Sequence, residues 1–234
     1  MHLSEAPLYD AVFLKRPNRF VSEVQLNSGE IVKAHMPNTG RMGELLIPGA
    51  PLRVAYLPSS KRKTAYTVLS VLTKDVWVCT YAAIANVLAY DYLNQKYEFD
   101  LLQREKLFLD SRFDLYAQFG GKKFLWEVKS VNLVVTENNR KIALFPDAPT
   151  SRGVKHLKGL IQAVKKGYEC GVIFVVLRSD AEVVKINGIT DPDLAKVIGE
   201  AVNAGINISA IRCTVDKNTI TVEKTLPFNG VYLG

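Results

Sequence analysis

Two ionisable residues lie in the middle of an apolar segment near the centre of the chain. Glu127 and Lys129 are separated by one residue within the alternating segment 124–131, and residues two apart in a strand point to the same face. Both faces of this segment carry apolar residues, so we expect a strand inside a sheet, where charges are costly unless they are paired or bound to a metal. Taken alone, the two residues also fit a Glu–Lys contact on a solvated face.

A third ionisable residue extends the pattern. Asp114 stands among apolar neighbours in segment 111–116, and the Gly120-Gly121 turn that follows predicts an antiparallel hairpin with segment 124–131. Such a hairpin brings Asp114 alongside Glu127. Carboxylate oxygens are the ligands that Mg²⁺ or Mn²⁺ prefers, and a nearby lysine can orient or deprotonate water and offset charge on a phosphate.

The spacing of these residues resembles the D-x(n)-E-x-K pattern of the PD-(D/E)xK nuclease superfamily. The resemblance implies that Asp114, Glu127 and Lys129 are catalytic and that Asp114 and Glu127 hold the metal ion. Some relatives use a further acid near Glu105 as a ligand, although the segment 103–106 is equally compatible with a charge cluster on the surface.

A helix expected at residues 151–167 begins with three basic residues. Arg152, Lys155 and His156 share one face at spacings of three and four, and Arg152 and Lys155 could contact phosphates near the site. We interpret His156 as a surface or half-buried helix residue rather than as a catalyst. Ser151 is expected to cap this helix.

Basic residues also gather near turns in the first third of the chain, with the aromatic residues Phe20 and Tyr66 close to them. Such a combination suits a groove for a single strand or a phosphate backbone, whereas any one of the residues could equally be a solvated loop charge. The candidate nucleic-acid-binding residues here are Arg16, Arg19, Arg41, Lys61, Arg62 and Lys63.

Composition and charge narrow the class of protein. The 234 residues are 48% hydrophobic and carry a net charge of +7, which favours polyanionic partners. No apolar run approaches the length of about 20 residues that spans a membrane, and no signal peptide is evident. Three scattered cysteines, Cys79, Cys170 and Cys213, predict buried, reduced thiols. We therefore expect a cytoplasmic protein without a membrane partner.

Two domains of different class are expected. Residues 1–81 contain five short alternating segments separated by turn residues, which predict a small β-barrel of the oligonucleotide-binding (OB) type. Residues 82–234 alternate helical and strand patterns and predict a mixed-sheet α/β domain. The expected elements are strands at 20–26, 30–35, 52–57, 67–72, 76–80, 101–109, 112–119, 124–131, 171–177 and 206–214, and helices at 82–93, 151–167 and from 192 to Gly205.

The chain also resembles the sugar fermentation stimulation protein family over nearly its whole length. That family is described as DNA-binding and linked to sugar metabolism, and the resemblance implies an OB-like barrel followed by a domain like the PD-(D/E)xK restriction endonucleases. An acid that usually precedes Arg152-Gly153 is replaced here by Ser151. The blocks that carry the resemblance are 13–20, 37–42, 61–64, 111–114, 127–131 and 145–148.

Two functions remain open on the sequence. One is a protein that binds single- or double-stranded DNA and cleaves it with Mg²⁺ or Mn²⁺ as a deoxyribonuclease. The alternative is a non-catalytic DNA-binding regulator of sugar metabolism genes with a vestigial nuclease site. RNA is a weaker candidate partner than DNA, because the barrel is the only feature that supports RNA binding. The sequence leaves open the DNA target and the oligomeric state, a homodimer included.

Overall fold

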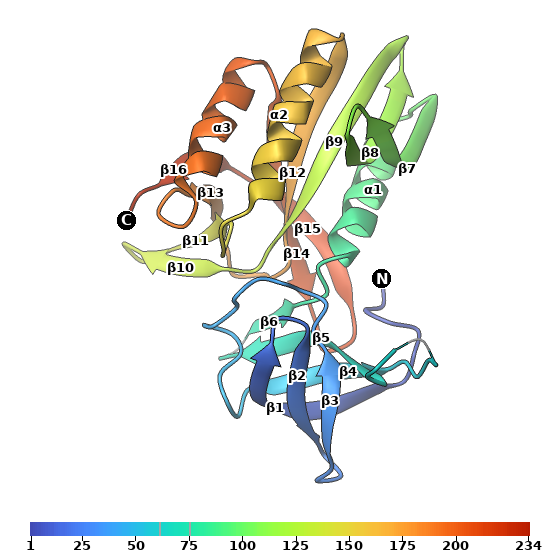
Figure 1. The fold of residues 1–234 in the computed structure, drawn as a ribbon, viewed down its shortest axis with the longest axis vertical. Helices are drawn as coiled ribbons and strands as arrows, with labels where there is room; N and C mark the ends of the chain where they lie inside the picture. Colours follow the sequence, from blue (N-terminus) through green and yellow to red (C-terminus); the bar gives the residue numbers. More distant parts are fainter. Residues whose placement is uncertain (61, 75) are drawn as a thin grey trace. The chain divides into compact units, whose positions relative to one another are not determined.

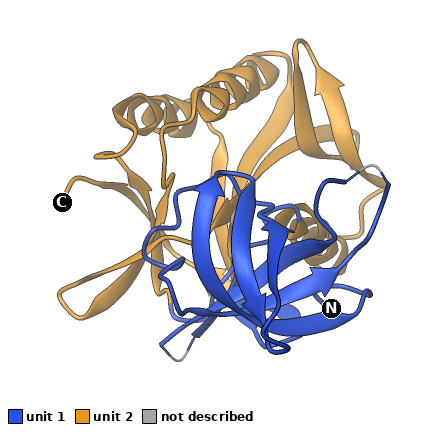
Figure 2. Cartoon of the chain, turned by 60° about the horizontal axis from the view of Figure 1, so that its bottom comes forward, with its two compact units in different colours: residues 1–83, 177–180, 213–223 blue, residues 84–176, 181–212, 224–234 orange. Residues whose placement is uncertain are grey.

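The computed structural model describes residues 1–60, 62–74 and 76–234, and these fall into two compact units (Figure 2). The first unit contains residues 1–83, 177–180 and 213–223, and the second contains residues 84–176, 181–212 and 224–234. Two short segments from late in the chain are thus grouped with the N-terminal residues.

The first unit is a closed five-stranded barrel. Antiparallel pairing joins β3, β2, β1, β4 and β5 in that order, and a parallel pairing of β3 with β5 closes the ring. This is the OB-type barrel expected from the sequence, and its interior is filled by alternate apolar residues such as Val24, Leu52 and Val68. The strands are β1 (Leu8–Asn18), β2 (Val21–Leu26), β3 (Ile31–His35), β4 (Pro51–Tyr56), β5 (Tyr66–Thr73) and β6 (Val76–Cys79).

One barrel strand differs from the sequence-based expectation. β1 was not predicted, because its second half reads Lys15-Arg16-Pro17-Asn18, a polar sequence with a proline that is typical of a loop. The strand predicted at 76–80 exists as β6, but it pairs with β5 outside the closed ring.

The second unit contains most of a mixed six-stranded sheet (Figure 1), although the parts of its outer strands β14 and β15 within residues 213–223 are grouped with the first unit. β9 lies inside this sheet, parallel to β12 on one side and antiparallel to β8 on the other. The Gly120-Gly121 turn between β8 and β9 has positive φ at both residues, so the expected hairpin is confirmed. In spatial order the strands are β15 (Ile220–Leu226), β14 (Asn207–Val215), β12 (Tyr168–Val176), β9 (Lys122–Val131), β8 (Ser111–Phe119) and β7 (Leu101–Phe108).

Three helices cover the two faces of this sheet. α2 (Ser151–Lys165) packs beside α3 (Pro192–Asn203) over one face, where β9 presents Leu125 to the core. α1 (Ile84–Lys96) packs on the opposite face of the sheet. Trp126 is directed to this face, where it lines the same pocket as α1 residues. No helix within the described ranges is long and apolar enough to cross a membrane.

The N-terminus of α2 differs from its expected form. Thr150, rather than Ser151, is the capping residue, and its hydroxyl oxygen accepts a hydrogen bond from the Gly153 amide at 3.0 Å. Asp191 caps α3 in the same way by accepting from the Leu194 amide, and Pro192 follows it as predicted. Asp191 also accepts a hydrogen bond from the Thr150 amide, which ties the two helix starts together.

A second, four-stranded sheet in this unit was not predicted. Its strands are short. One of them, β11, follows a turn with positive φ at Asn138 and Asn139, and another, β16, lies close to the C-terminus. All three cysteines are buried and none forms a disulfide, as expected. The strands of this sheet, in spatial order, are β10 (Val134–Glu137), β11 (Arg140–Phe145), β13 (Val183–Asn187) and β16 (Phe228–Tyr232).

The close approach of β12 to the Trp126 ring depends on a glycine. A Cβ atom at Gly171 would lie 2.6 Å from Trp126 Cδ1 and 3.3 Å from the Asn207 carbonyl oxygen. We predict that Gly171→Ala lowers the free energy of unfolding by about 1–3 kcal/mol, because the half-buried indole ring of Trp126 must move away from the new Cβ atom. Thermal unfolding followed by circular dichroism would measure this effect.

The matched control is Gly199→Ala on the exposed face of α3, where a Cβ atom meets nothing within 4 Å. This change should stabilise the helix by up to about 1 kcal/mol. Equal effects of the two substitutions would contradict the packing described for Gly171.

Candidate functional site

Asp114 is held at the point where β8 and β9 separate. The backbone pairing of the two strands runs from Phe119–Lys122 to Leu115–Trp126. Beyond that pair, Asp114 Oδ2 accepts a hydrogen bond from the Val128 amide at 2.8 Å, so the carboxylate takes the place of a backbone acceptor. Asp114 can reach the Val128 amide because the backbone pairing of β8 with β9 stops here.

A residue from α1 holds the other oxygen of Asp114. Asn86 Nδ2 donates a hydrogen bond to Asp114 Oδ1 at 2.8 Å. Despite the bonds from Val128 and Asn86, the pKa of Asp114 is raised, because burial and the negative charge of Glu127 disfavour its ionised form. The two carboxylates therefore lie close enough to repel each other.

Glu127 is almost fully buried and carries two basic partners. Its side chain is 4% exposed, and its Oε1 atom accepts hydrogen bonds from Lys129 Nζ and from His156 Nδ1, both at 2.5 Å. Burial alone would raise the pKa of Glu127, but the bonds from His156 and Lys129 outweigh it and hold the pKa below its usual value. Glu127 is consequently an anion at neutral pH, in the interior of the domain.

The second oxygen of Glu127 is left without a partner. Oε2 is buried and accepts no hydrogen bond from the described residues, a costly state for an ionised carboxylate. Since the N–H and C=O of one strand residue point to the same edge, and the Val128 amide bonds to Asp114, we expect the Val128 carbonyl to point to the β8 edge of β9 as well. A cation bound between Asp114 and Glu127 would relieve both the unpaired oxygen and the repulsion.

The protein supplies few other ligands for such a cation. Among residues 1–60, 62–74 and 76–234, no three His, Cys, Asp or Glu side chains form a group suited to a metal ion. The donor set here is two carboxylates with a backbone carbonyl, which suits a hard ion such as Mg²⁺ that retains several waters. The residues present therefore fit a divalent cation whose remaining ligands are water or substrate.

His156 belongs to this site although its residue type alone gave no reason to place it there. It is 6% exposed, and the ring of Phe113 packs edge-on against its imidazole at 5.8 Å. Because a carboxylate oxygen only accepts, the Nδ1 atom carries the proton. Its position within the buried stripe of α2, which includes Gly153, Leu157 and Leu160, was the available sequence signal. No comparable signal marked Asn86.

Glu105 is not brought to the site. It occupies an irregular position in β7, with a φ of 57° and no pairing between the Arg104–Leu115 and Lys106–Phe113 pairs. Its carboxylate is 66% exposed and forms an ion pair with Arg112 at 3.2 Å. The structure thus gives Glu105 a surface ion pair, the alternative that its sequence neighbours allowed.

The basic residues near the start of α2 are exposed. Arg152 directs its Nε atom to His156 Nε2 at 3.4 Å, which places its guanidinium beside the carboxylate cluster. Lys155 instead forms an ion pair with Asp110 at 2.9 Å. Of the two, Arg152 is the one next to the site.

The basic residues of the barrel have different environments. The guanidinium of Arg16 donates to four backbone carbonyls, those of Arg19, Asn38, Gly40 and Arg41, at 2.6–3.0 Å, so its role in the structure is to hold a loop. Arg19 and Arg41 are exposed, and Arg19 lies 5.9 Å from the Phe20 ring centroid.

Two loops of the barrel carry several of the predicted nucleic-acid-binding residues. The β1–β2 turn contains Arg19, and the β4–β5 loop contains the exposed Arg62 and Lys63. In OB-type barrels these two loops flank the oligonucleotide-binding face. Lys61, which belongs to the same β4–β5 loop by sequence, lies outside the described residues.

Comparison with known proteins finds matching family models and similar chains. Residues 80–219 match the family model of the sugar fermentation stimulation protein RE domain, and residues 14–80 match that of its N-terminal OB domain. A sugar fermentation stimulation protein homolog of Desulforamulus reducens is 38% identical, over 94% of this chain and 92% of its own length. One from Acetivibrio thermocellus is 40% identical, over 91% of each chain.

A solved structure is similar over the whole chain. Pyrococcus furiosus SfsA in complex with Ca²⁺ shares 26% sequence identity with this chain and superimposes with a TM-score of 0.83. The match covers 98% of this chain and 99% of the other. The similarity therefore extends over both units.

The ion pairing of Glu127 makes a stability prediction with a defined pH dependence. Glu127→Gln should lower the free energy of unfolding by about 3–5 kcal/mol at pH 7, because it leaves buried basic groups without their anion. The folded-state pKa of Glu127 lies below the usual value of a glutamate side chain. The stabilisation is therefore present above that value and is lost as the pH falls through the folded-state pKa.

Urea denaturation in EDTA, at pH 7 and in steps below pH 4.5, would test this. Glu105→Gln is the control, since Glu105 is exposed and its removal should change stability by no more than about 0.5 kcal/mol. A penalty for Glu127→Gln that stayed constant with pH would show that the carboxylate charge is not what stabilises the site.

Proposed function

The chain belongs to the sugar fermentation stimulation protein family, and from this premise we propose that it is a DNA-binding protein with a metal-dependent phosphodiesterase site. One observation carries the proposal. Glu127, a buried and ionised carboxylate, has one oxygen without a hydrogen-bond partner among the described residues, and its charge disfavours the ionised form of a second carboxylate, Asp114. A folded protein tolerates such an arrangement most readily when a cation neutralises it.

The Ca²⁺ in the similar Pyrococcus furiosus structure supports a divalent ion for this chain as well. Ca²⁺ and Mg²⁺ both take oxygen ligands, and Mg²⁺ keeps several waters while bound by one or two carboxylates. We propose Mg²⁺ or Mn²⁺ as the working ion, with Asp114 and Glu127 as its carboxylate ligands and the Val128 carbonyl beside them.

When bound, the ion would supply Lewis-acid stabilisation of phosphate charge and a bound water of lowered pKa. Lys129 lies two residues from Glu127 on the same face of β9, with its ammonium already at the carboxylate. From there it can orient an attacking water and offset negative charge that develops on the phosphate. His156 is a positioning residue, because it fixes Glu127 from the α2 side.

DNA binding is proposed for the barrel loops and the start of α2. Arg19, Arg62 and Lys63 lie on the two loops that flank the ligand face of OB-type barrels, and Arg41 is exposed in the β3–β4 segment. Arg152 adds a positive charge beside the carboxylate cluster. Phosphate contacts from such residues provide affinity without sequence specificity.

One observation favours the second candidate, a DNA-binding protein that cleaves nothing. Glu127 already has two basic partners, Lys129 and His156, which neutralise the carboxylate without a metal ion. In that case the site would be a buried polar network that stabilises the domain. Cleavage and metal binding separate the two candidates.

The cleavage prediction uses purified protein with plasmid and single-stranded DNA. We expect cleavage with Mg²⁺ or Mn²⁺ and none in EDTA, and we expect Asp114→Asn and Lys129→Met each to lower the rate by at least about 100-fold. Glu105→Gln should cleave at the wild-type rate, since Glu105 ion-pairs with Arg112 on the surface.

Two outcomes would count against the enzyme. Cleavage that survives both Asp114→Asn and Lys129→Met would indicate a contaminating nuclease. Binding of DNA without cleavage under any metal would favour the non-catalytic candidate.

Metal binding can be measured separately by calorimetric titration with Ca²⁺. We expect Asp114→Asn to abolish the binding heat, and we expect wild-type affinity to fall as the pH is lowered, because Asp114 must lose its proton and its pKa is raised. Affinity that was unchanged by pH or by Asp114→Asn would locate the ion elsewhere.

A further inference from the structure

The turn between β7 and β8 has two features that stability alone does not explain. Leu109 and Asp110 form a two-residue hairpin turn, and Leu109 has a φ of 52°, a conformation that hairpins of this kind usually give to glycine or asparagine. A leucine there costs about 1–2 kcal/mol. The side chain recovers little of this by burial, since it is 64% exposed.

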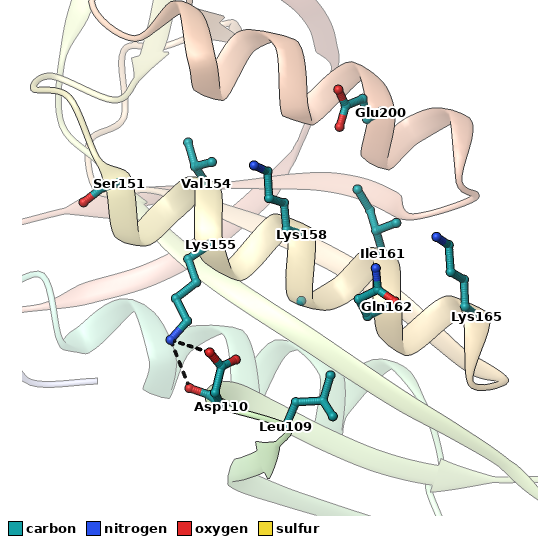
Figure 3. A pocket seen from close by; sticks show the side chains of 11 residues that line it. Leu109, Asp110, Ser151, Val154, Lys155, Lys158, Ile161, Gln162, Lys165 and Glu200 are labelled. Carbon is teal, nitrogen blue, oxygen red and sulfur yellow. Dashed lines mark hydrogen bonds and ion pairs between the residues drawn. The ribbon is translucent and has the colours of Figure 1, made fainter.

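This turn forms one wall of a groove along α2, shown in Figure 3. The groove has a volume of about 630 Å³, and three lysines of α2 line it, Lys155, Lys158 and Lys165. Spacings of three and seven residues place these lysines along roughly 15 Å of helix. That length corresponds to about four base-pair steps of duplex DNA.

The charges in the groove are only partly compensated. Lys155 bonds to both the carboxylate and the carbonyl oxygen of Asp110, which fixes the turn against α2. The described residues form no ion pair with Lys158 or Lys165. Among the described residues that line the groove, Glu200 of α3 is the one other acidic residue. The groove therefore presents the ammonium groups of Lys158 and Lys165 on the α3 side of α2, and the exposed Leu109 lies across the helix from them (Figure 3).

The groove and the carboxylate site belong to the same hairpin. Asp114 is the fourth residue of β8, five residues after Leu109, which corresponds to about 16 Å along an extended strand. His156, which bonds to Glu127, follows Lys155 directly in α2. A duplex held in the groove would thus lie within a few base pairs of the carboxylates.

We propose that the α2 groove binds the phosphate backbone of duplex DNA through Lys158 and Lys165, and that Leu109 inserts between base pairs as a wedge. This rests on the proposed function, since it specifies how the DNA is held beside the site. Apolar wedges of this kind, leucine among them, unstack a base step and bend the duplex at a cost of a few kcal/mol. A rigid, anchored turn with its leucine outward meets that requirement.

The experiment measures binding and base unstacking in EDTA, so it does not depend on cleavage. Duplex oligonucleotides carry 2-aminopurine, whose fluorescence rises when its neighbours unstack. Wild-type protein should raise the fluorescence severalfold. Leu109→Gly should abolish this rise and also raise the melting temperature of the protein, because glycine relieves the strained φ. Leu107→Ala, an equally exposed leucine outside the groove, should leave the fluorescence rise unchanged.

The lysines are tested by the salt dependence of binding. The double substitution of Lys158 and Lys165 by alanine should reduce the slope of log Kd against log salt concentration by about 2. Glu200→Gln should tighten binding by about two- to fivefold, since it removes a negative charge that faces phosphate. A wild-type slope in the double variant would overturn the groove as a DNA site.

Other outcomes would identify a different occupant. A fluorescence rise that persists in Leu109→Gly overturns the wedge, and a preference for single-stranded DNA or RNA over duplex overturns the duplex assignment. A change in sedimentation caused by Leu109→Gly would make the turn a contact between copies of the chain. If cleavage is absent but unstacking depends on Leu109, the phosphodiesterase proposal fails and this one stands.

Discussion

The second unit is organised around one buried negative charge. Glu127 is placed in the middle of the sheet by β9, which has hydrogen-bonded strands on both sides, and a carboxylate there is costly unless basic groups or a metal ion compensate its charge. Lys129 supplies one from the same strand and His156 supplies the other from α2. The apolar face of α2 packs on the sheet through Leu157, Leu160 and Ala163, and His156 brings a basic group from that face to Glu127.

The separation of β8 from β9 brings a second carboxylate, Asp114, close to Glu127. If the backbone pairing continued past Leu115–Trp126, a backbone carbonyl of β8 would accept the hydrogen bond of the Val128 amide. The Asp114 carboxylate would then not bond to that amide. Because the pairing stops, the Asp114 carboxylate takes that hydrogen bond and comes to lie near Glu127. An irregularity in a sheet thus provides the second carboxylate, as is common beside functional sites.

Much of this arrangement could be predicted from the sequence, because it depends on local patterns. Alternation in 124–131 predicted an interior strand, and the Gly120-Gly121 turn predicted the hairpin that brings Asp114 and Glu127 together. Asn86 could not be found, because its hydrogen bond to Asp114 depends on where α1 packs. The ion pair of Glu105 with Arg112 could not be distinguished from a ligand role by sequence, because the break in the β7 pairing at this residue leaves no sequence signal.

The barrel shows the same division between local and non-local information. Alternation and turns predicted its type, whereas β1 was missed because its basic, proline-containing half reads as a loop. That half nevertheless places Arg16, whose bonds to four carbonyls hold a loop, whereas the phosphate contact that its charge suggested stays a prediction. Charge alone does not distinguish a cation that binds phosphate from one that binds backbone.

We propose that Asp114 and Glu127 together hold a divalent cation. Crystals grown with Mn²⁺ and measured at its absorption edge would locate the ion by anomalous scattering without reference to activity. We expect a strong anomalous peak within about 2.0–2.6 Å of oxygens from both carboxylates. No peak there at millimolar Mn²⁺, with Lys129 and His156 still bonded to Glu127, would contradict it.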